Sequence, residues 1–142
     1  VGHALDAVKL LMANDEGGAL ELANHLETLN QARRDLDEDL TEEAISQMVE
    51  QPPGRSCTLV TGEGWHRGVL GIVASRLIEQ RYCPAIVLSE ESEVLTGSAR
   101  SVPGIDILAA FEECKHLIDQ FGGHPMAAGL TIRRENMEEF TT

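Results

Sequence analysis

Hydrophobic residues recur at steps of three and four through the first third of the chain, which is the spacing of one face of an α-helix. Asp and Glu are frequent at the positions between them, and after Gly18 neither proline nor glycine occurs before Pro52. We therefore expect one long amphipathic helix that ends at the break over residues 51–54. Its apolar stripe comprises Leu22, Leu26, Leu29, Leu36, Leu40, Ala44, Ile45, Met48 and Val49, with an interruption at Arg33.

Two interpretations of this helix are open. Its apolar face can pack on its own domain, as the faces of most amphipathic helices do. Alternatively, about 35 residues at 1.5 Å each would span about 50 Å, more than a domain of this size needs, and the helix would connect the domain to another. A shorter pattern from Leu5 to Ala13 predicts a preceding helix, with Asn14 and Asp15 between the two, and hence an antiparallel helical pair or a bent arm.

The period changes after residue 56. A β-branched run over residues 57–61 predicts a strand, a glycine-rich loop follows, and helical spacing runs from Val69 to Tyr82. A second apolar strand over residues 85–89 completes a βαβ unit, for which we expect parallel strands and a right-handed crossover. Residues 94–101 alternate large with small or polar side chains, as a strand with one open face does.

The last third predicts two further helices and one more strand. Asp106 is placed to cap a helix that runs through Leu117. A glycine turn over residues 122–125 precedes a strand over residues 126–132, and a helix begins at Arg134. Together these elements predict an α/β fold, with a mixed and mostly parallel sheet flanked by helices and preceded by a long helical arm.

Composition and charge narrow the classes of function. The chain has 142 residues, enough for one domain with an arm, and with 42% hydrophobic and 25% charged residues it can bury a core. Eleven Lys and Arg against 24 Asp and Glu leave a net charge of −13. A broad surface for polyanions is excluded, because such surfaces neutralise phosphates with Lys and Arg. Any contact with nucleic acid must therefore be local.

The chain carries no pattern of a secreted, zinc-binding or membrane-spanning protein. Its three cysteines lie far apart without a CxxC pair, which is typical of reduced thiols in a cytosol. Apolar stretches end well short of the roughly 18 residues that a spanning helix needs, and no basic-then-apolar leader opens the chain. We expect a soluble, cytoplasmic protein that does not contact a membrane.

The first of three polar clusters is Trp65-His66-Arg67-Gly68, at the start of a predicted helix. Free backbone N–H groups, the positive end of the helix dipole and two donor side chains would favour an anion there. The alternative is that the glycines only make the turn and that Trp65, the single tryptophan, packs in the core.

Two other clusters lie further along the chain. Ser98 and Arg100 are two residues apart on one face of a strand, so that a hydroxyl and a guanidinium can hold one phosphate together. Gly122, Gly123 and His124 combine backbone that a ligand can approach closely with an imidazole. An exposed strand pair and a capping turn are the respective alternatives.

No cluster of carboxylates accompanies these donors. Hydrolysis of a phosphodiester by metal ions needs several Asp or His ligands that converge on the ions. Asp106 and Asp119 are far apart in sequence, and Cys83, next to Pro84, is expected to be a buried and inert thiol. We therefore expect a chain that binds but does not cut, with neither a catalytic residue nor a metal ligand of its own.

Three ordered motifs, Gly64–Leu77, Gly97–Ser101 and Phe121–Gly129, resemble in order and spacing the DHH-associated domain of the RecJ-like exonucleases, which degrade single-stranded DNA and belong to the DHH phosphoesterase superfamily. Leu29–Arg34 stands where the connector of that family is expected, so the resemblance covers nearly the whole chain. It implies a helical connector over residues 1–51 and an α/β nucleic-acid-binding domain over residues 56–142 with a truncated last helix.

The resemblance also implies that this chain is part of a longer 5′-to-3′ exonuclease. In this family a preceding DHH domain, absent here, holds manganese or magnesium and performs the hydrolysis, whereas the associated domain closes the cleft and holds the DNA end. The expected partners are single-stranded DNA and that DHH domain, and the isolated chain is expected to be inactive and to bind no metal itself.

By the same resemblance, Ser98 and Arg100 would hold the terminal 5′ phosphate, while His66 and His124 would face the scissile phosphate. The family commonly shows Gly-Ser-Gly-Arg-Ser where this chain has Ala99. The full set of expected phosphate-binding or nucleic-acid-binding residues is Trp65, His66, Arg67, Ser98, Arg100, Ser101, Gly122, Gly123 and His124.

Two other functions are open. One is the substrate-binding domain of a nanoRNA or dinucleotide phosphodiesterase from the wider superfamily, whose members carry a similar glycine-glycine-histidine turn; competition by a dinucleotide would reveal it. The other is a non-catalytic nucleotide-binding or partner-docking module that works through its acidic arm. A partner-docking module should be indifferent to a 5′ phosphate on a single strand.

Overall fold

The structure, a computed structural model, describes residues 16–142. The helix expected from Leu5 to Ala13 and the pair Asn14 and Asp15 lie outside the described residues. The α/β class expected from the sequence is confirmed. In chain order the helices and strands are α2 (Glu16–Glu50), β1 (Thr58–Glu63), α3 (Leu70–Gln80), β2 (Ala85–Glu91), β3 (Val94–Arg100), α4 (Ile107–Glu113), β4 (Ile118–His124), β5 (Ala127–Arg133) and α5 (Met137–Thr141).

The expected long helix is confirmed as α2, a single helix of 35 residues. The chain divides into two compact units, residues 1–38 and 39–142, with the boundary inside α2. Within the second unit, Leu40, Ala44 and Met48 are buried at four-residue steps and pack in one core with α3 and β1. This last part of α2 thus behaves as an ordinary amphipathic helix. The expected boundary after residue 51 stays a prediction.

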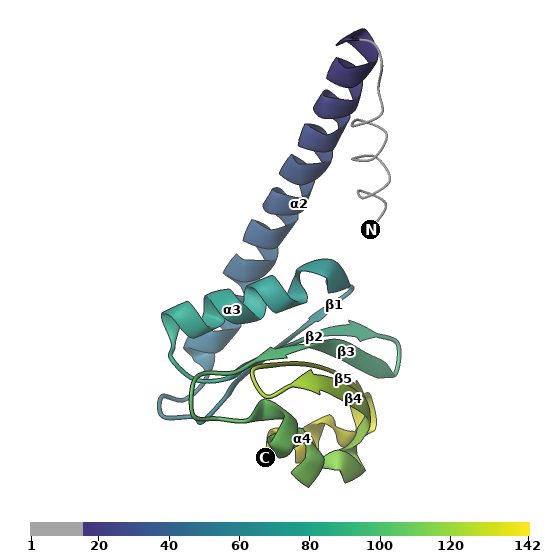
Figure 1. The fold of residues 1–142 in the computed structure, drawn as a ribbon. Coiled ribbons are helices and arrows are strands. Elements are labelled where there is room, and N and C mark those ends of the chain that lie inside the picture. The colour runs from purple at the N-terminus through teal and green to yellow at the C-terminus, as the bar shows by residue number, and fades with distance from the viewer. Residues whose placement is uncertain (1–15) are drawn as a thin grey trace. The chain divides into compact units, whose positions relative to one another are not determined.

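One mixed sheet holds the five strands in the order β1-β2-β3-β5-β4 (Figure 1). Among the strands of residues 16–142, only β1 and β2 pair in parallel, as the βαβ pattern predicts, whereas the other three pairs are antiparallel. The expectation of mostly parallel strands was therefore wrong. The reason is that α3 is the connection of the parallel pair, whereas tight two-residue turns join β2 to β3 and β4 to β5, and such turns can join only antiparallel neighbours.

The glycine turn expected over residues 122–125 was also placed wrongly. Gly122, Gly123 and His124 are the end of β4, and the turn itself lies at Pro125 and Met126. Glycines lower the local preference for a strand, so nothing in the segment indicates one until β5 supplies the partner for its hydrogen bonds. The predicted cap of the preceding helix is confirmed, since Asp106 Oδ1 accepts from the Ala109 N–H at 2.9 Å.

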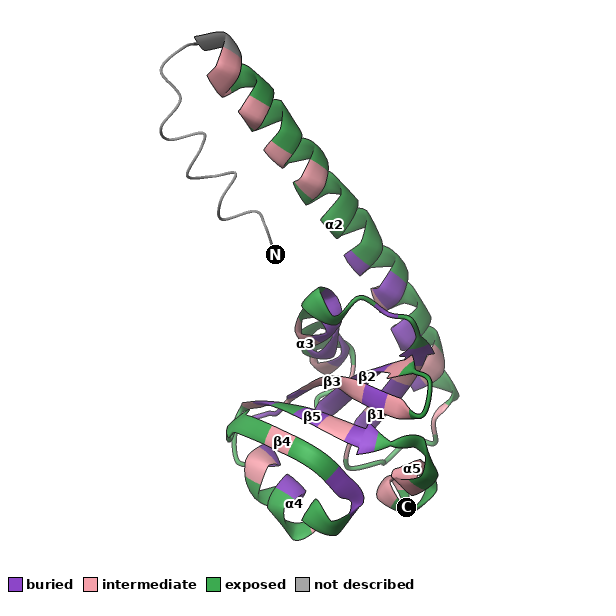
Figure 2. Cartoon of the chain, turned by 90° about the vertical axis from the view of Figure 1, so that its right-hand side faces the viewer, coloured by how far each residue is buried: buried purple, intermediate pink, exposed green. Residues whose placement is uncertain are grey.

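The two faces of the sheet are packed differently. On one face, α3 lies over β2 and β3 and shares a core with β1, β2 and the end of α2. On the other face, α4 and α5 pack against a second core that reaches all five strands (Figure 2). Towards the α3 side, β4 and the middle of β5 expose Gln120, Gly122, His124 and Gly129. The outer half of the α3 side of the sheet is thus the part that a ligand can reach.

The free edge of β1 is closed by the side chains of Gln47, in the last turn of α2, and Gln51, just after its end. The Gln47 amide accepts from the Thr61 N–H at 3.1 Å and donates to the Thr61 carbonyl at 2.6 Å, and the Gln51 amide donates to the Leu59 carbonyl at 2.6 Å. Four residues of helix rise about 6 Å and two residues of strand about 6.6 Å, so glutamines one turn apart meet alternate residues of the strand. These bonds satisfy backbone groups that an edge strand would otherwise leave open.

No helix within residues 16–142 has both the length and the apolar character needed to cross a lipid bilayer.

Candidate nucleic-acid interface

The register of β3, β5 and β4 places nine residues in three rows on the α3 side of the sheet. Residues that pair directly across antiparallel strands point to the same face, and residues two apart along one strand do so as well. We call the resulting surface the three-row face. Its rows are Arg100, Ala127 and His124, then Ser98, Gly129 and Gly122, and then Thr96, Thr131 and Gln120.

Two of the polar clusters found in the sequence come together on this face. Ser98 and Arg100 lie on β3, whereas Gly122 and His124 lie on β4, with one strand between them. Two strand spacings amount to about 10 Å, so the guanidinium and the imidazole can contact neighbouring groups of one ligand. More than twenty residues separate the two clusters in sequence, and only the pairing of both strands with β5 makes them neighbours.

The Arg100 side chain is half-buried and lies against Gly71 of α3. A Cβ atom on Gly71 would collide with Nη2 and lie 3.1 Å from Cζ of the guanidinium. On the other side, Nη1 donates to the Ala99 carbonyl at 2.9 Å. The missing side chain at Gly71 therefore makes the space that holds the guanidinium at the end of β3.

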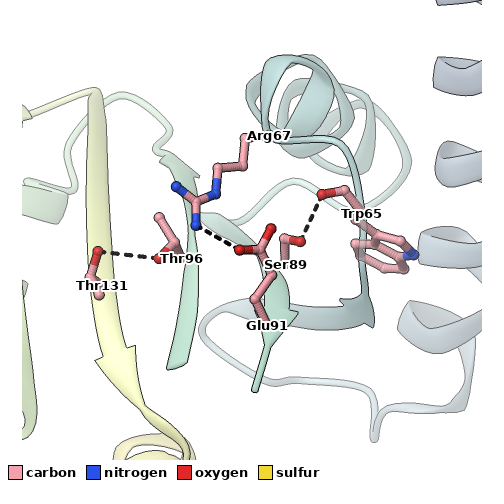
Figure 3. A network of polar contacts seen from close by, with 6 residues as sticks. All are labelled: Trp65, Arg67, Ser89, Glu91, Thr96 and Thr131. Carbon is pink, nitrogen blue, oxygen red and sulfur yellow. Dashed lines mark hydrogen bonds and ion pairs between the residues drawn. The ribbon is translucent and has the colours of Figure 1, made fainter. Parts of the chain in front are cut away.

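The fold buries Trp65 of the first cluster and leaves His66 and Arg67 exposed. Trp65 is buried, and its indole N–H donates to Glu43 Oε2 at 3.3 Å. Its carbonyl accepts from the Ser89 hydroxyl at 2.7 Å (Figure 3). This placement agrees with the packing alternative for the tryptophan. His66 is exposed and its Nδ1 accepts from the Gly68 N–H at 3.0 Å, which leaves the proton of the neutral ring on Nε2.

Arg67 lies at the far end of the three-row face. Its guanidinium forms an ion pair with Glu91 at 3.1 Å, and both side chains are more than half exposed. Glu91 is two residues along β2 from Ser89, which pairs with Thr96, so the ion pair lies next to the Thr96 row (Figure 3). Exposed ion pairs contribute about 0–1 kcal/mol, so another anion can compete for this arginine.

Ser101 is not brought to the face. It is buried, and its hydroxyl is 2.6 Å from the Ile105 carbonyl and 3.3 Å from the Val102 carbonyl. In the cluster Gly122-Gly123-His124, Gly123 has a φ of 140°, a value that residues with side chains rarely adopt. It therefore shapes the end of β4 from which His124 projects.

A hollow of about 360 Å³ occupies the end of the three-row face furthest from Arg100. Gly122 and Gly129 form part of its lining, together with Thr96 and Thr131. The two threonine hydroxyls lie 3.3 Å apart, and Figure 3 shows this contact. Thr96, Thr131 and Gln120, which line this hollow, are not among the residues expected from the sequence. For Thr96 a signal was present, because it continues the alternation of Ser98 and Arg100 towards the start of β3.

Carboxylates accompany the arginines at this end of the face. Arg133 on β5 pairs with Asp119 at 3.1 Å, just as Arg67 pairs with Glu91, and this hydrogen bond raises the pKa of Arg133. Groups of three or more His, Cys, Asp and Glu that could hold a metal ion do not occur within residues 16–142. The residues that the structure describes therefore do not fit a site for a catalytic manganese or magnesium ion.

The thiols lie away from the three-row face. Burial, reinforced by the nearby Cys83, raises the pKa of the Cys57 thiol to about 12, which keeps it protonated and unreactive at neutral pH. Cys57 and Cys114 both line an apolar pocket of about 320 Å³ on the α4 side of the sheet. Cys83 is half-buried beside the Thr58 hydroxyl, at 3.4 Å.

Comparison with known proteins gives one family and several relatives. The model of the DHHA1 domain matches residues 54–142. The single-stranded-DNA-specific exonuclease RecJ of Bacillus subtilis is 42% identical over 141 residues, which are 98% of this chain and 18% of that protein. The RecJ of Haemophilus influenzae is 41% identical over 145 residues, which cover 94% of this chain and 25% of that protein.

A solved structure agrees with these matches. RecJ of Thermus thermophilus in complex with Mg²⁺ superposes with a TM-score of 0.84 at 28% identity, and the match covers 99% of this chain and 22% of that one. The chain thus spans about a fifth to a quarter of the length of the relatives that it matches.

Proposed function

From the premise that this chain belongs to the DHHA1 domain family, which the match over residues 54–142 establishes, we propose that it is the substrate-holding part of a longer RecJ-like exonuclease. In this proposal the three-row face binds single-stranded DNA by its 5′ phosphate and closes the cleft of a separate catalytic domain. The observation that carries the proposal is the placement of Ser98, Arg100 and His124 on one reachable face of the sheet.

The chemistry of these groups supports a terminal phosphate as ligand. A guanidinium donates in a planar fork that matches two oxygens of one phosphate, and the Ser98 hydroxyl lies two residues along the same strand to reach a third. A terminal phosphate carries more charge than an internal phosphodiester and has three free oxygens, so such a grip favours strand ends. His124 can donate to a phosphate further along the ligand.

The net charge of −13 agrees with recognition of an end rather than of a long backbone. Each phosphate neutralised along a strand needs its own cation, whereas a pocket for one end needs a single arginine and a few neutral donors. We propose that hydrolysis, with its manganese or magnesium ions, takes place in the part of the longer protein that lies outside this chain. Within the present chain the role of Arg100, Ser98 and His124 is to position the DNA.

The proposed function predicts that the chain distinguishes strand ends. We expect a 5′-phosphorylated single strand of deoxythymidines to bind at least tenfold more tightly than the same strand without the phosphate, because charge-assisted hydrogen bonds contribute about 1.5–3 kcal/mol. Chemical-shift changes in NMR titrations of the chain detect both affinities.

Equal binding of the two strands would contradict the proposal and favour a partner-docking module. Stronger competition by a dinucleotide than by longer strands would favour a dinucleotide phosphodiesterase. Degradation of the strand by the pure chain with manganese would place catalytic groups here after all.

The contact between Gly71 and Arg100 gives a second prediction. In Gly71→Ala the new methyl group displaces the guanidinium, so we expect affinity for the 5′-phosphorylated strand to fall several-fold. The melting temperature should stay the same or rise, because alanine is favoured over glycine in a helix by up to about 1 kcal/mol. Thermal denaturation followed by circular dichroism, together with the NMR titration, separates the two effects. Unchanged affinity would mean that the position of the guanidinium is unimportant for binding.

A further inference from the structure

The row of Thr96, Thr131 and Gln120 has no part in holding the terminal phosphate, yet it borders the hollow on the three-row face. Gln120 is exposed, and the two threonines are half-buried with their hydroxyls 3.3 Å apart. One hydroxyl proton is used between the two threonines, which leaves the second proton and the Gln120 amide to donate elsewhere. The row therefore offers neutral hydrogen-bond donors next to an unfilled space.

The spacing of the rows matches a polynucleotide that begins at Arg100. Neighbouring rows are two residues apart along each strand, which is about 7 Å. This is close to the step that an extended single strand makes from one phosphate to the next. A strand whose 5′ phosphate lies between Ser98 and Arg100 can thus place its next nucleotide over Gly122 and Gly129, where a backbone without side chains allows close approach.

The electrostatics of the hollow differ from those of the Arg100 row. None of the residues that line the hollow is charged, and the arginines beyond it, Arg67 and Arg133, are paired with carboxylates. A nucleotide held here gains hydrogen bonds to its phosphate and sugar oxygens without neutralising its charge. Its binding therefore releases no further counterion, and the contribution of this row should not depend on salt.

We propose that Thr96, Thr131 and Gln120 form a second nucleotide subsite, which holds the sugar-phosphate unit next to the 5′ end of single-stranded DNA through neutral hydrogen bonds. The proposal rests on the proposed function, since it takes the 5′ phosphate to lie at Ser98 and Arg100. It assigns different roles to the Arg100 row and to the row of Thr96, Thr131 and Gln120. Charge recognises the end of the strand, and the neutral row recognises that a second nucleotide follows.

The test uses the double variant Thr96→Val with Thr131→Val, which removes both hydroxyls and keeps side chains of the same shape and strand preference. The probes are thymidine 5′-monophosphate and 5′-phosphorylated oligodeoxythymidines of two to four nucleotides, titrated at several salt concentrations. We expect the wild-type chain to bind the dinucleotide about tenfold more tightly than the mononucleotide, and the double variant to lose this gain while it binds the mononucleotide as before. The slope of log affinity against log salt should be the same for both proteins.

Two further variants complete the experiment. Thr61→Val, a half-buried strand threonine that alternates onto the opposite face of the sheet, should leave every affinity unchanged. Gln120→Glu, at an exposed position, tests the same subsite if the double variant does not fold, and should weaken the longer probes only. A dinucleotide gain that survives both changes overturns the subsite, as does an equal loss for mononucleotide and dinucleotide. If the wild-type chain binds none of the phosphorylated probes, the proposed function itself fails.

Discussion

Replacement of Arg100 by alanine is expected to abolish the preference for a 5′-phosphorylated end. The guanidinium shares its row with Ala127 and His124, and it supplies the planar donor pair that a phosphate needs. Loss of a charge-assisted pair costs about 1.5–3 kcal/mol, so affinity for the phosphorylated strand should fall by about ten- to a hundredfold. Binding of the unphosphorylated strand should change far less.

Salt dependence gives this prediction a second measurement. Release of one counterion contributes about 0.7 to the slope of log affinity against log salt for single strands, and Arg100→Ala should remove about that amount. Arg100→Lys should recover part of the slope but little of the affinity, because an ammonium group lacks the fork geometry. Arg55→Ala, at the apolar pocket on the α4 side, is the matched control. Equal losses on phosphorylated and unphosphorylated strands would argue against Arg100 as the end-binding residue.

The largest effect on stability is expected for Gly97→Ala in β3. A methyl group at this position would collide with the Val87 carbonyl oxygen and lie 2.8 Å from Cα of Leu88. Both atoms belong to the backbone of β2, which cannot move aside without disturbing the centre of the sheet. Overpacking of this kind costs about 1–3 kcal/mol or more, and we expect a loss at the upper end of that range. Urea denaturation followed by circular dichroism measures it.

Gly122→Ala is the control for that substitution. Gly122 is also a strand glycine, but a Cβ there would meet no atom within 4 Å. Its stability in urea should stay within about 0.5 kcal/mol of the wild type, as is usual for exposed positions. A Gly97→Ala protein as stable as Gly122→Ala would show that β2 and β3 can separate locally at little cost.

The long helix was predictable because its signal is local. Helical spacing without proline or glycine specifies α2 wherever the rest of the chain lies. The burial of its stripe was not predictable in the same way: Leu40, Ala44 and Met48 are buried, whereas Val49 of the same stripe is 69% exposed. Which residues of the stripe are buried depends on where β1 and α3 pack against the helix. Gln47 shows that a polar residue can also fix this packing, because its side chain bonds to the backbone of β1.

For the candidate site, the sequence predicts which residues share a face of one strand but not how the strands are arranged. Ser98 and Arg100 are two apart on a strand, so their common face follows from the alternation of side chains. Their relation to His124 does not, because β4 was not predicted and its place next to β5 depends on long-range pairing. Trp65 illustrates the opposite case, since it lies in a motif of polar and glycine residues but is buried by contacts with the core.

The sequence by itself determined the α/β class, the presence of the long helix and of the βαβ unit, and the local clusters of Ser, Arg and His residues on an acidic chain. These follow from local periodicity, turn residues and charge, each of which acts over a few neighbouring residues. Only the tertiary structure decided that three strand pairs are antiparallel, that Thr96, Thr131 and Gln120 line a hollow, and that Ser98 and Arg100 share one face of the sheet with His124. The physical reason is that strand register and sheet order are set by hydrogen bonds and core packing between segments far apart in the chain, and no local pattern encodes which segments will meet.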